Sequence, residues 1–426
     1  MPKKKFHTNT NAPNHTRKNK LHTNTNTSNC VRKKKLHKRT ITFEDDPSIL
    51  PIDILLNILI NVPAKPLLRF KSVSKPWNVM ISDNQFKKTH RDQSKALGHE
   101  KLLLQRFNSN VFEFRNLERS QLVMMENQLI KFPLKRFQRA VGLLCSCDGL
   151  VLLKNPKAYK NYALWNPSTR DQYRTLTCPH NHLYYNNLPR GVSACGLCYD
   201  SSVDDYKVIL IYDLYYVSYS LNNNSWTRKT GFPCPVQRLP PRDIVSSGIS
   251  LEGCAFWSLN YGEVRLFVDG PSTIIYFDVK SDEMKSFPTP DFVGENDFFF
   301  LTSIKDCLSL YSGNIHSVVL DIWIMQQEES WNLLMSISNL PSICKKFVQD
   351  RVLLGCTRNG EVVFQGWQCC RIFMYNPQQQ LFRKTKISMD LPIASICLDS
   401  LYSSCLNLKH KRKRRSATLR KVRYDI

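Results

Sequence analysis

The sequence predicts a multidomain chain in which a short α-helical unit precedes an all-β domain, a β-propeller of six or seven blades. Two observations support this. Residues 50–86 are dense in large apolar side chains and interrupted by prolines, whereas residues 101–403 alternate short runs of branched and aromatic residues with turn clusters. In this longer region, a single pattern recurs about every fifty residues, the period of kelch-like blades.

The helical unit is expected to contain three short helices. The first has helical spacing of its apolar residues, Ile54, Leu55, Ile58, Leu59 and Val62. Pro63 ends this helix, and Pro66 fits the first turn of the second, where its missing N–H costs nothing. Ser74 is the expected N-cap of the third, which places Pro76 in a first turn as well.

A short last helix over Gln85–His90 is also expected, with Asn84 as its candidate cap. A helix that is apolar nearly all round is buried on more than one side, and a unit of about forty residues rarely closes a core alone. We therefore expect this segment to bury apolar surface against the rest of the chain or against another protein.

The β domain is built from a repeated unit of a strand, a polar turn and a second strand. The unit occurs over residues 163–176, 218–230, 275–287, 321–334 and 373–386. A further apolar strand precedes each unit, so five blades are visible, and residues 101–135 supply at least one more. Residues 395–403 are the candidate closing strand, pairing with a strand near 101–117.

Both domains resemble one known family. The segments LPIDILLNIL, VPAKPLLRFKSVSKPW and MISDNQF resemble a plant-type F-box. The segments CSCDGLVLL, LWNPSTRDQYRTL, CGLCYDSSVDDYKVILI and DIWIMQQEESWNLLMSI resemble the F-box-associated domain of plant F-box proteins. The expected organisation is a disordered basic tail (1–46), the F-box (47–92), the propeller domain (100–404) and a second basic tail (405–426).

The resemblance implies a substrate-recognition subunit of a Skp-cullin-F-box ubiquitin ligase. In that family the helices dock on the Skp adaptor, the propeller holds a target protein, and the subunit itself is not an enzyme and needs no cofactor. The family pattern places the adaptor contacts on Leu50, Pro51, Ile54, Leu55, Ile58, Leu59, Pro63, Leu68, Phe70, Val73 and Trp77. The competing interpretation is a helical cap that merely packs on the propeller.

Catalytic motifs are missing from the sequence. We find no nucleophile elbow, no phosphate-binding glycine loop and no HExxH motif. The paired acids Asp45-Asp46 and Asp204-Asp205 fall in a linker and in a turn before a strand, which does not favour acid–base catalysis.

Cys195 and Cys198 form a CxxC pair, with Cys178, His180 and His182 upstream as further zinc-ligand candidates. A structural zinc site needs four tetrahedral ligands, usually in two close pairs. In a strand the two cysteines would face opposite sides. Because no apolar signal peptide precedes the chain and no apolar run approaches twenty residues, we expect free buried thiols in a reducing compartment, no metal and no membrane partner.

The formal net charge of +25 is concentrated in the tails. Residues 1–40 hold 12 Lys/Arg and no acid, and residues 409–426 hold 9 Lys/Arg and one Asp, which leaves about +5 for residues 41–408. This argues against a dedicated nucleic-acid domain, although a nuclear nucleic-acid- or chromatin-associated protein acting through its tails is the alternative function. A nuclear-import signal is indicated at Lys409, Lys411, Arg412, Lys413, Arg414 and Arg415, so localisation in the nucleus, the cytoplasm or both is expected.

Target recognition is expected on propeller loops, because loops on a rigid scaffold carry binding. The two long candidates are residues 178–191 and 231–243, which are rich in aromatic, Arg and Pro residues.

Overall fold

The computed structural model describes residues 50–403 except 107–108, 118–121, 123–128, 134–139, 157, 159, 171–172, 181–183, 186–187, 190–191, 213–214, 232–245, 260–272, 295–296, 315–318, 327–329, 339–350, 367–370, 386 and 388–391. Both tails, the import cluster and most of loop 231–243 therefore lie outside the described residues. Among the described residues, no helix has the length and apolar character that crossing a membrane requires.

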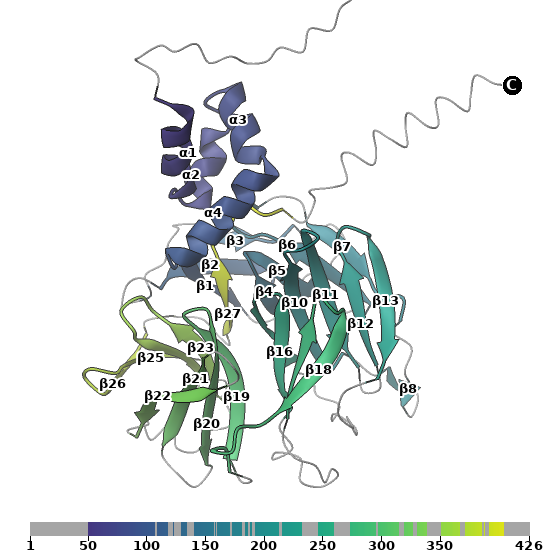
Figure 1. Ribbon diagram of the computed structural model, residues 1–426, viewed down its shortest axis with the longest axis vertical. Coiled ribbons are helices and arrows are strands. Elements are labelled where there is room, and N and C mark those ends of the chain that lie inside the picture. The colour runs from purple at the N-terminus through teal and green to yellow at the C-terminus, as the bar shows by residue number, and fades with distance from the viewer. Residues whose placement is uncertain are drawn as a thin grey trace, which may run out of the picture. The chain divides into compact units, whose positions relative to one another are not determined.

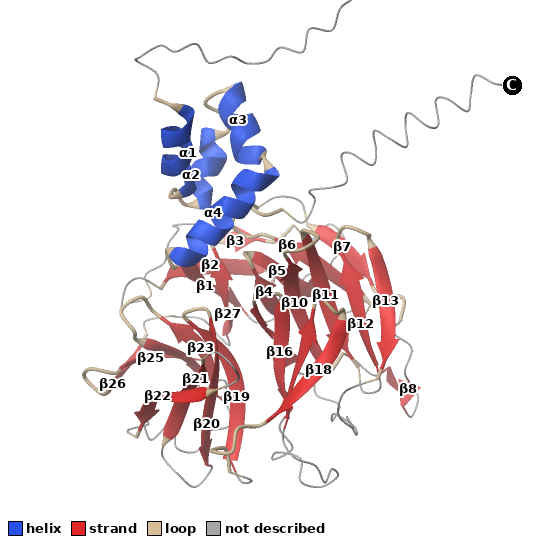
Figure 2. Ribbon diagram, in the orientation of Figure 1, coloured by secondary structure: helices blue, strands red, loops and turns tan. Residues whose placement is uncertain are grey.

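The helical unit contains the three expected helices and a longer fourth one (Figures 1 and 2). These are α1 (Ile52–Ile60), α2 (Ala64–Phe70), α3 (Lys75–Ser82) and α4 (Asn84–Ala96). The predicted cap of α3 is confirmed, since the Ser74 hydroxyl accepts a hydrogen bond from the Trp77 amide at 3.3 Å. Pro76 lies in the first turn of that helix, where it removes no helical hydrogen bond.

The prediction for the last helix was wrong at both ends. Asp83, not Asn84, is the N-cap of α4, and its carboxylate accepts from the amides of Gln85 and Phe86. The helix continues past His90 to Ala96. The prediction stopped short because the buried side of this helix carries polar residues, which a search for apolar periodicity does not register.

The propeller has six blades, each a four-stranded antiparallel sheet (Figure 1). Blade 1 is β4 (Gly142–Cys147), β5 (Leu150–Lys154), β6 (Asn161–Trp165) and β7 (Arg174–Thr177). Blade 2 is β10 (Ala194–Asp200), β11 (Asp205–Ile211), β12 (Tyr215–Ser220) and β13 (Ser225–Thr230), and a short parallel strand, β14 (Ser246–Ser247), adds to β10. Blade 3 is β15 (Ile249–Leu251), β16 (Cys254–Leu259), β17 (Thr273–Asp278) and β18 (Glu283–Pro288).

The remaining blades complete the ring. Blade 4 is β19 (Asp297–Ile304), β20 (Cys307–Asn314), β21 (Leu320–Met325) and β22 (Trp331–Ile337), and blade 5 is β23 (Arg351–Cys356), β24 (Val362–Gly366), β25 (Arg371–Asn376) and β26 (Leu381–Lys384). Blade 6 combines β1 (Glu100–Arg106), β2 (Val111–Asn116) and β3 (Ile130–Lys131) with the last strand, β27 (Pro392–Leu398). A two-stranded hairpin, β8 (Tyr184–Tyr185) with β9 (Leu188–Pro189), follows blade 1.

The five sequence repeats coincide with the outer hairpins of blades 1 to 5, that is, with the third and fourth strand of each sheet. The predicted ring closure is confirmed too, because β27 pairs antiparallel with β1, with Leu103 opposite Ser395. The closing strand begins at Pro392, earlier than predicted, and ends at Leu398. Residues 399–403 therefore do not belong to the sheet.

The two edges of the ring differ in their connections. At the edge that contacts the helices, which we call the helix-proximal edge, strands are joined mostly by tight turns such as Asp148-Gly149 and Glu252-Gly253. Several turns hold Asp or Asn at positive φ, as at Asp148 (51°) and Asp204 (53°), a conformation that these residues tolerate. The long connections, including 178–193 and 231–245, join strands whose ends lie at the opposite edge, the distal edge.

Apolar clusters between neighbouring sheets hold the blades together. Between blades 2 and 3, Trp257 of β16 lies against the backbone of β10, and its Nε1 donates to the Cys195 carbonyl at 3.0 Å. A Cβ at Gly196 would lie 2.5 Å from the indole ring, so only glycine allows this approach.

Candidate adaptor-binding face and its attachment to the propeller

The helical unit exposes several large apolar side chains. The most exposed are Leu50 (48%), Ile52 (39%), Ile54 (48%), Ile58 (51%), Val73 (63%) and Val79 (71%). Ile54 and Ile58 are four residues apart on α1 and therefore share one helix face. Such exposure is informative because side chains of this size are usually buried, and a concentration of them marks an interaction surface.

The residues that the family pattern assigns to the adaptor fall into three groups. Six are exposed, namely Leu50, Pro51, Ile54, Ile58, Pro63 and Val73, and four are half-buried, namely Leu55, Leu68, Phe70 and Trp77. Leu59 is 1% exposed and lies in the core of the helical unit with Leu67 and Ile81. Leu59 therefore stabilises the helices and offers no surface to a partner.

The family pattern missed Ile52 and Val79, which are exposed on α1 and α3. Val79 lies two residues before Ile81 and therefore on the opposite side of α3, a spacing that could have marked it as exposed. Ile52 is seven residues before Leu59, on the same face of α1, and the spacing gives no signal for it. Among the half-buried residues, Phe70 and Trp77 meet edge to face with ring centroids 5.6 Å apart, and thereby connect α2 to α3.

The propeller's last described residues complete the helical core. Asp399, just after β27, accepts a hydrogen bond from the Ala64 amide at 3.1 Å, in the first turn of α2. Its other oxygen lies 2.9 Å from Lys101 Nζ. Leu401 is 2% exposed and packs in the same cluster as Leu59, Leu67 and Phe86. The helical unit is thus folded onto the chain segment that follows ring closure.

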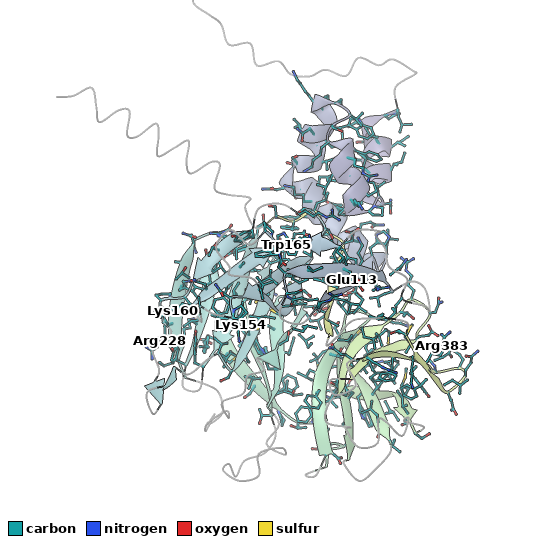
Figure 3. All side chains as sticks on the ribbon, turned by 180° about the vertical axis from the view of Figure 1, so that it is seen from behind. Glu113, Lys154, Lys160, Trp165, Arg228 and Arg383 are labelled. Atoms are coloured by element: carbon teal, nitrogen blue, oxygen red, sulfur yellow. The ribbon has the colours of Figure 1, made fainter. Side chains whose placement is uncertain are left out.

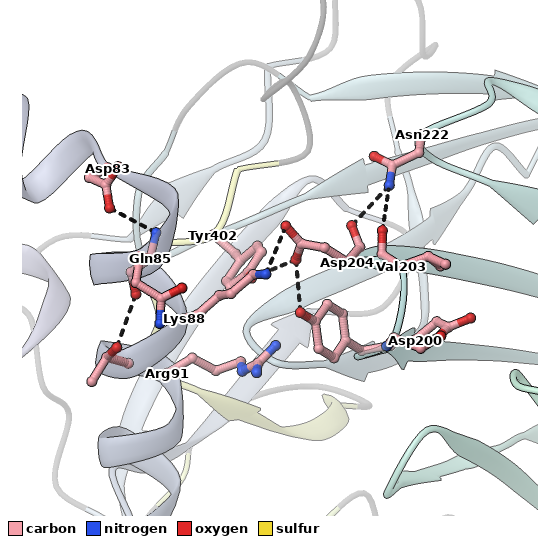
Figure 4. Close-up of polar contacts among 12 residues, drawn as sticks. Asp83, Gln85, Lys88, Arg91, Asp200, Val203, Asp204, Asn222 and Tyr402 are labelled. Atoms are coloured by element: carbon pink, nitrogen blue, oxygen red, sulfur yellow. Dashed lines mark hydrogen bonds and ion pairs between the residues drawn. The ribbon is translucent and has the colours of Figure 1, made fainter.

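Basic residues of helix α4 form ion pairs with acidic turns of blades 1 and 2, and Figure 4 shows the pair of Lys88 with Asp204 in blade 2. Lys88 lies 3.1 Å from the Asp204 carboxylate, and Arg91 and Lys95 lie 3.4 and 2.6 Å from that of the buried Asp148. The Arg91 guanidinium also stacks 4.1 Å from the centroid of the Tyr199 ring. Burial is the largest influence on the pKa of Arg91 and would lower it, but Asp148, Tyr206 and Asp92 together outweigh burial and raise the pKa, so the guanidinium stays charged.

The paired acids Asp204-Asp205 are engaged in this structure. Asp204 accepts from the Tyr199 hydroxyl at 2.8 Å in addition to its ion pair with Lys88. Asp205 accepts from the Asn222 amide at 2.9 Å and from the Ser220 hydroxyl. These carboxylates shape turns and the attachment of α4, whereas Asp45-Asp46 lies outside the described residues.

Cys195 and Cys198 lie on opposite faces of β10, as predicted. Cys195 packs in the cluster between blades 1 and 2, and Cys198 packs in the cluster between blades 2 and 3. Burial raises the pKa of Cys198. A hydrogen bond with Cys195, together with burial, raises the pKa of Cys145, so the thiols of Cys198 and Cys145 stay protonated. The residues that the structure describes contain no group of three or more His, Cys, Asp or Glu suited to a metal; His182 lies outside them.

The described ends of loop 178–191 lie at the distal edge. There the thiol of Cys178 is buried 3.7 Å from the Tyr212 hydroxyl, and the Tyr215 hydroxyl donates to the His180 carbonyl. Cys178 and the backbone of His180 thus connect blade 1 to blade 2.

Comparison with known families agrees with this architecture. The family model for the F-box associated beta propeller domain matches residues 100–403, and the model for the F-box domain matches residues 47–89. The chain belongs to the family of F-box proteins that carry an F-box-associated β-propeller.

Similar F-box proteins occur in Arabidopsis thaliana. An F-box/kelch-repeat protein of that plant is 28% identical over 318 residues, which covers 69% of this chain and 81% of the relative. The Arabidopsis F-box protein CPR1 is 26% identical over 340 residues, covering 72% of this chain and 76% of the relative.

Solved structures show weaker likenesses. A chain of a nidogen/laminin complex matches with a TM-score of 0.42 and 11% identity over 71% of this chain and 99% of its own length. A virginiamycin B lyase from Staphylococcus aureus matches with a TM-score of 0.39 and 10% identity, over 70% and 97%. These values are too low to bear on function.

Proposed function

We propose that this protein is the target-recognition subunit of a Skp-cullin-F-box ubiquitin ligase. The observation that carries the proposal is the exposed apolar pair on α1, Ile54 and Ile58, in a unit that matches the F-box family. The core of that unit is already completed by Leu401 of the same chain, so the exposed pair is left for a partner in trans. The partner is a Skp-type adaptor and, through it, a cullin.

The receptor works by proximity and is not itself an enzyme. It would hold a target protein on the propeller while the adaptor connects it to the ligase, which raises the effective concentration of target lysines near the activated ubiquitin. Ubiquitin transfer then requires no bond-making residue of this chain. Because residues 399–403 and α4 fasten the helices to the ring, the target would be carried at a defined position relative to the adaptor.

The test is co-purification of the full chain with a Skp adaptor. The double variant Ile54→Asp/Ile58→Asp removes two apolar contacts of about 1.5–3 kcal/mol each and should weaken binding by a hundredfold or more. The matched control Val203→Asp/Leu381→Asp changes two equally exposed apolar residues of the propeller and should bind like wild type. A wild-type chain that does not bind, or a double variant that binds as well, contradicts the proposal.

We also propose that the basic C-terminal cluster Lys409–Arg415 directs nuclear import. Deleting 409–426, alone and together with 1–40, should shift a fluorescent fusion toward the cytoplasm. Unchanged localisation in both deletions would rule the import role out. The rival nucleic-acid function predicts binding that falls steeply with salt and disappears with the same two deletions.

A further inference from the structure

Charged side chains are sorted between the two edges of the propeller. The carboxylates that form ion pairs lie mostly in helix-proximal turns or next to them, namely Asp148, Asp204, Asp278, Asp282, Glu361 and Asp399. Their partners come from α4 and from neighbouring strands. At this edge positive charge is therefore largely neutralised by nearby acids.

The distal edge carries basic side chains without such partners. They lie at strand ends, namely Arg106 (end of β1), Lys131 (opposite the start of β2), Lys154 (end of β5), Arg228 (near the end of β13), Arg371 (start of β25) and Lys384 (end of β26). We call these six residues the distal basic crescent. Within the portion of the chain that the structure describes, no ion pair joins any of them to a carboxylate.

The crescent spans four neighbouring blades of the ring. Its residues belong to blades 5, 6, 1 and 2, which follow one another through the closing blade. Acids described at the distal edge, Asp291, Asp297 and Asp321, belong to blades 3 and 4 or to the connection between them.

Some of the crescent is held in place by aromatic packing. The Arg228 guanidinium lies 4.0 Å from the centroid of the Tyr215 ring, and the hydroxyl of this tyrosine donates to the His180 carbonyl. Figure 3 shows Arg228, Lys154 and Lys160 farther from the helices than Trp165. A cation fixed in this way loses less conformational freedom when an anion binds than a free side chain does.

We infer that the distal basic crescent binds an acidic segment of the target protein. This inference rests on the proposed receptor function and names the chemistry of the target. Unpaired cations along an arc attract and orient a complementary chain of carboxylates. A polypeptide segment is the occupant inferred, because the proposed receptor function holds a protein and carboxylates are the anionic side chains that a protein carries.

The test uses the full chain and a fluorescein-labelled peptide of twenty residues that alternates Glu and Ser, followed by fluorescence anisotropy. The crescent variant is Lys154→Glu/Arg228→Glu/Arg371→Glu. The matched control, Lys280→Glu/Lys305→Glu/Arg358→Glu, makes the same charge change at exposed positions of helix-proximal turns. Both variants keep the basic tails, so any binding of the peptide to the tails is common to all three proteins.

The crescent variant should bind the peptide about tenfold more weakly than wild type, and the control within twofold. Equal binding by all three proteins, or an equal loss in the two variants, overturns the inference. Binding of a twenty-nucleotide single strand is measured in parallel. If charge reversal in the crescent weakens the binding of this strand but not of the peptide, the surface is a nucleic-acid site and the inference is wrong.

Adaptor co-purification is recorded for each variant, so that failure of the receptor function is seen separately from failure of the crescent. Unfolding curves verify that the variants fold. If the charge-reversed chain does not fold, Lys154→Gln/Arg371→Gln takes its place, with an expected loss of about threefold in peptide affinity.

Discussion

Asp399 is a buried residue of the propeller that contacts both the helical unit and strand β1. It is 1% exposed, accepts from the Ala64 amide and pairs with Lys101. A buried carboxylate is costly unless its charge is compensated, and here one oxygen accepts from the α2 amide while the other forms an ion pair with Lys101 of β1. The residue thus connects two elements that are far apart in sequence.

Replacing Asp399 with alanine should lower the free energy of unfolding by about 2–4 kcal/mol, because it leaves a buried amide without an acceptor and Lys101 without its counter-charge. Urea unfolding followed by circular dichroism measures the change. Asp291→Ala, at an exposed turn residue, is the control and should change stability by less than about 0.5 kcal/mol. A loss that small in Asp399→Ala would show that the attachment does not depend on this carboxylate.

Helix α4 is the element that the sequence described least well. Its buried side contains His90, Arg91 and Ser94, which look like surface residues in a hydropathy pattern. They are buried because the helix packs between the other helices and two acidic turns of the propeller, where Arg91 and one ring nitrogen of His90 find partners. His90 is the example on the helical side, with Nε2 2.8 Å from the Val62 carbonyl.

Packing of α4 should make stability depend on pH through His90. Burial lowers the pKa of His90 below its ordinary value of 6.5, although the Val62 carbonyl opposes this, so the folded chain holds the neutral ring. The unfolded chain binds the proton more readily. Above about pH 6.5 the ring is mostly neutral in both the folded and the unfolded chain, so His90 does not change the free energy of unfolding. As the pH drops below 6.5 toward the pKa of the folded chain, the unfolded chain binds the proton first and the free energy of unfolding falls.

His90→Gln keeps a donor for Val62 but cannot titrate. Unfolding free energies measured between pH 7.5 and 5 should fall more steeply for wild type than for this variant. Parallel curves would mean that His90 is protonated as easily in the folded chain as in the unfolded one.

Ring closure links the stability of the whole molecule to its last strand. β27 is the innermost strand of blade 6, and the residues directly after it, Asp399 and Leu401, complete the helical unit. Propeller and helices are therefore expected to unfold together, although each resembles a separate family module.

Truncated chains test whether the folding of the helical unit depends on the last strand of the propeller and on the residues that follow it. A chain that ends at Ser403 keeps every described contact and should keep wild-type protection of the α2 and β1 amides in hydrogen exchange. A chain that ends at Leu391 loses β27, Asp399 and Leu401, and should lose protection in both elements. If α2 stayed protected in the shorter chain, the helical unit would be independent of the ring.

Much of the candidate site was readable from the sequence. Ile54 and Ile58 were assigned to the adaptor face by a family pattern whose residue types and spacing are local, and both are exposed. Leu59, in the same pattern, is buried, because helical spacing alone does not say which of two adjacent faces meets a partner. The small net charge of residues 41–408, about +5, gave no sign that acids and bases are separated between the two edges, since a net charge does not say where the charged residues lie.

The sequence by itself determined the type and order of the elements, the fifty-residue blade period and the Ser74 cap of α3, because these depend on neighbours along the chain. Only the tertiary structure decided the blade count, the length of α4, the completion of the helical core by Leu401 and the grouping of cations at the distal edge. These features bring together residues that are distant in the chain, such as Ala64 and Asp399, which are 335 positions apart. Such pairings are selected by burial and by the hydrogen-bond needs of buried polar groups, which no local pattern records.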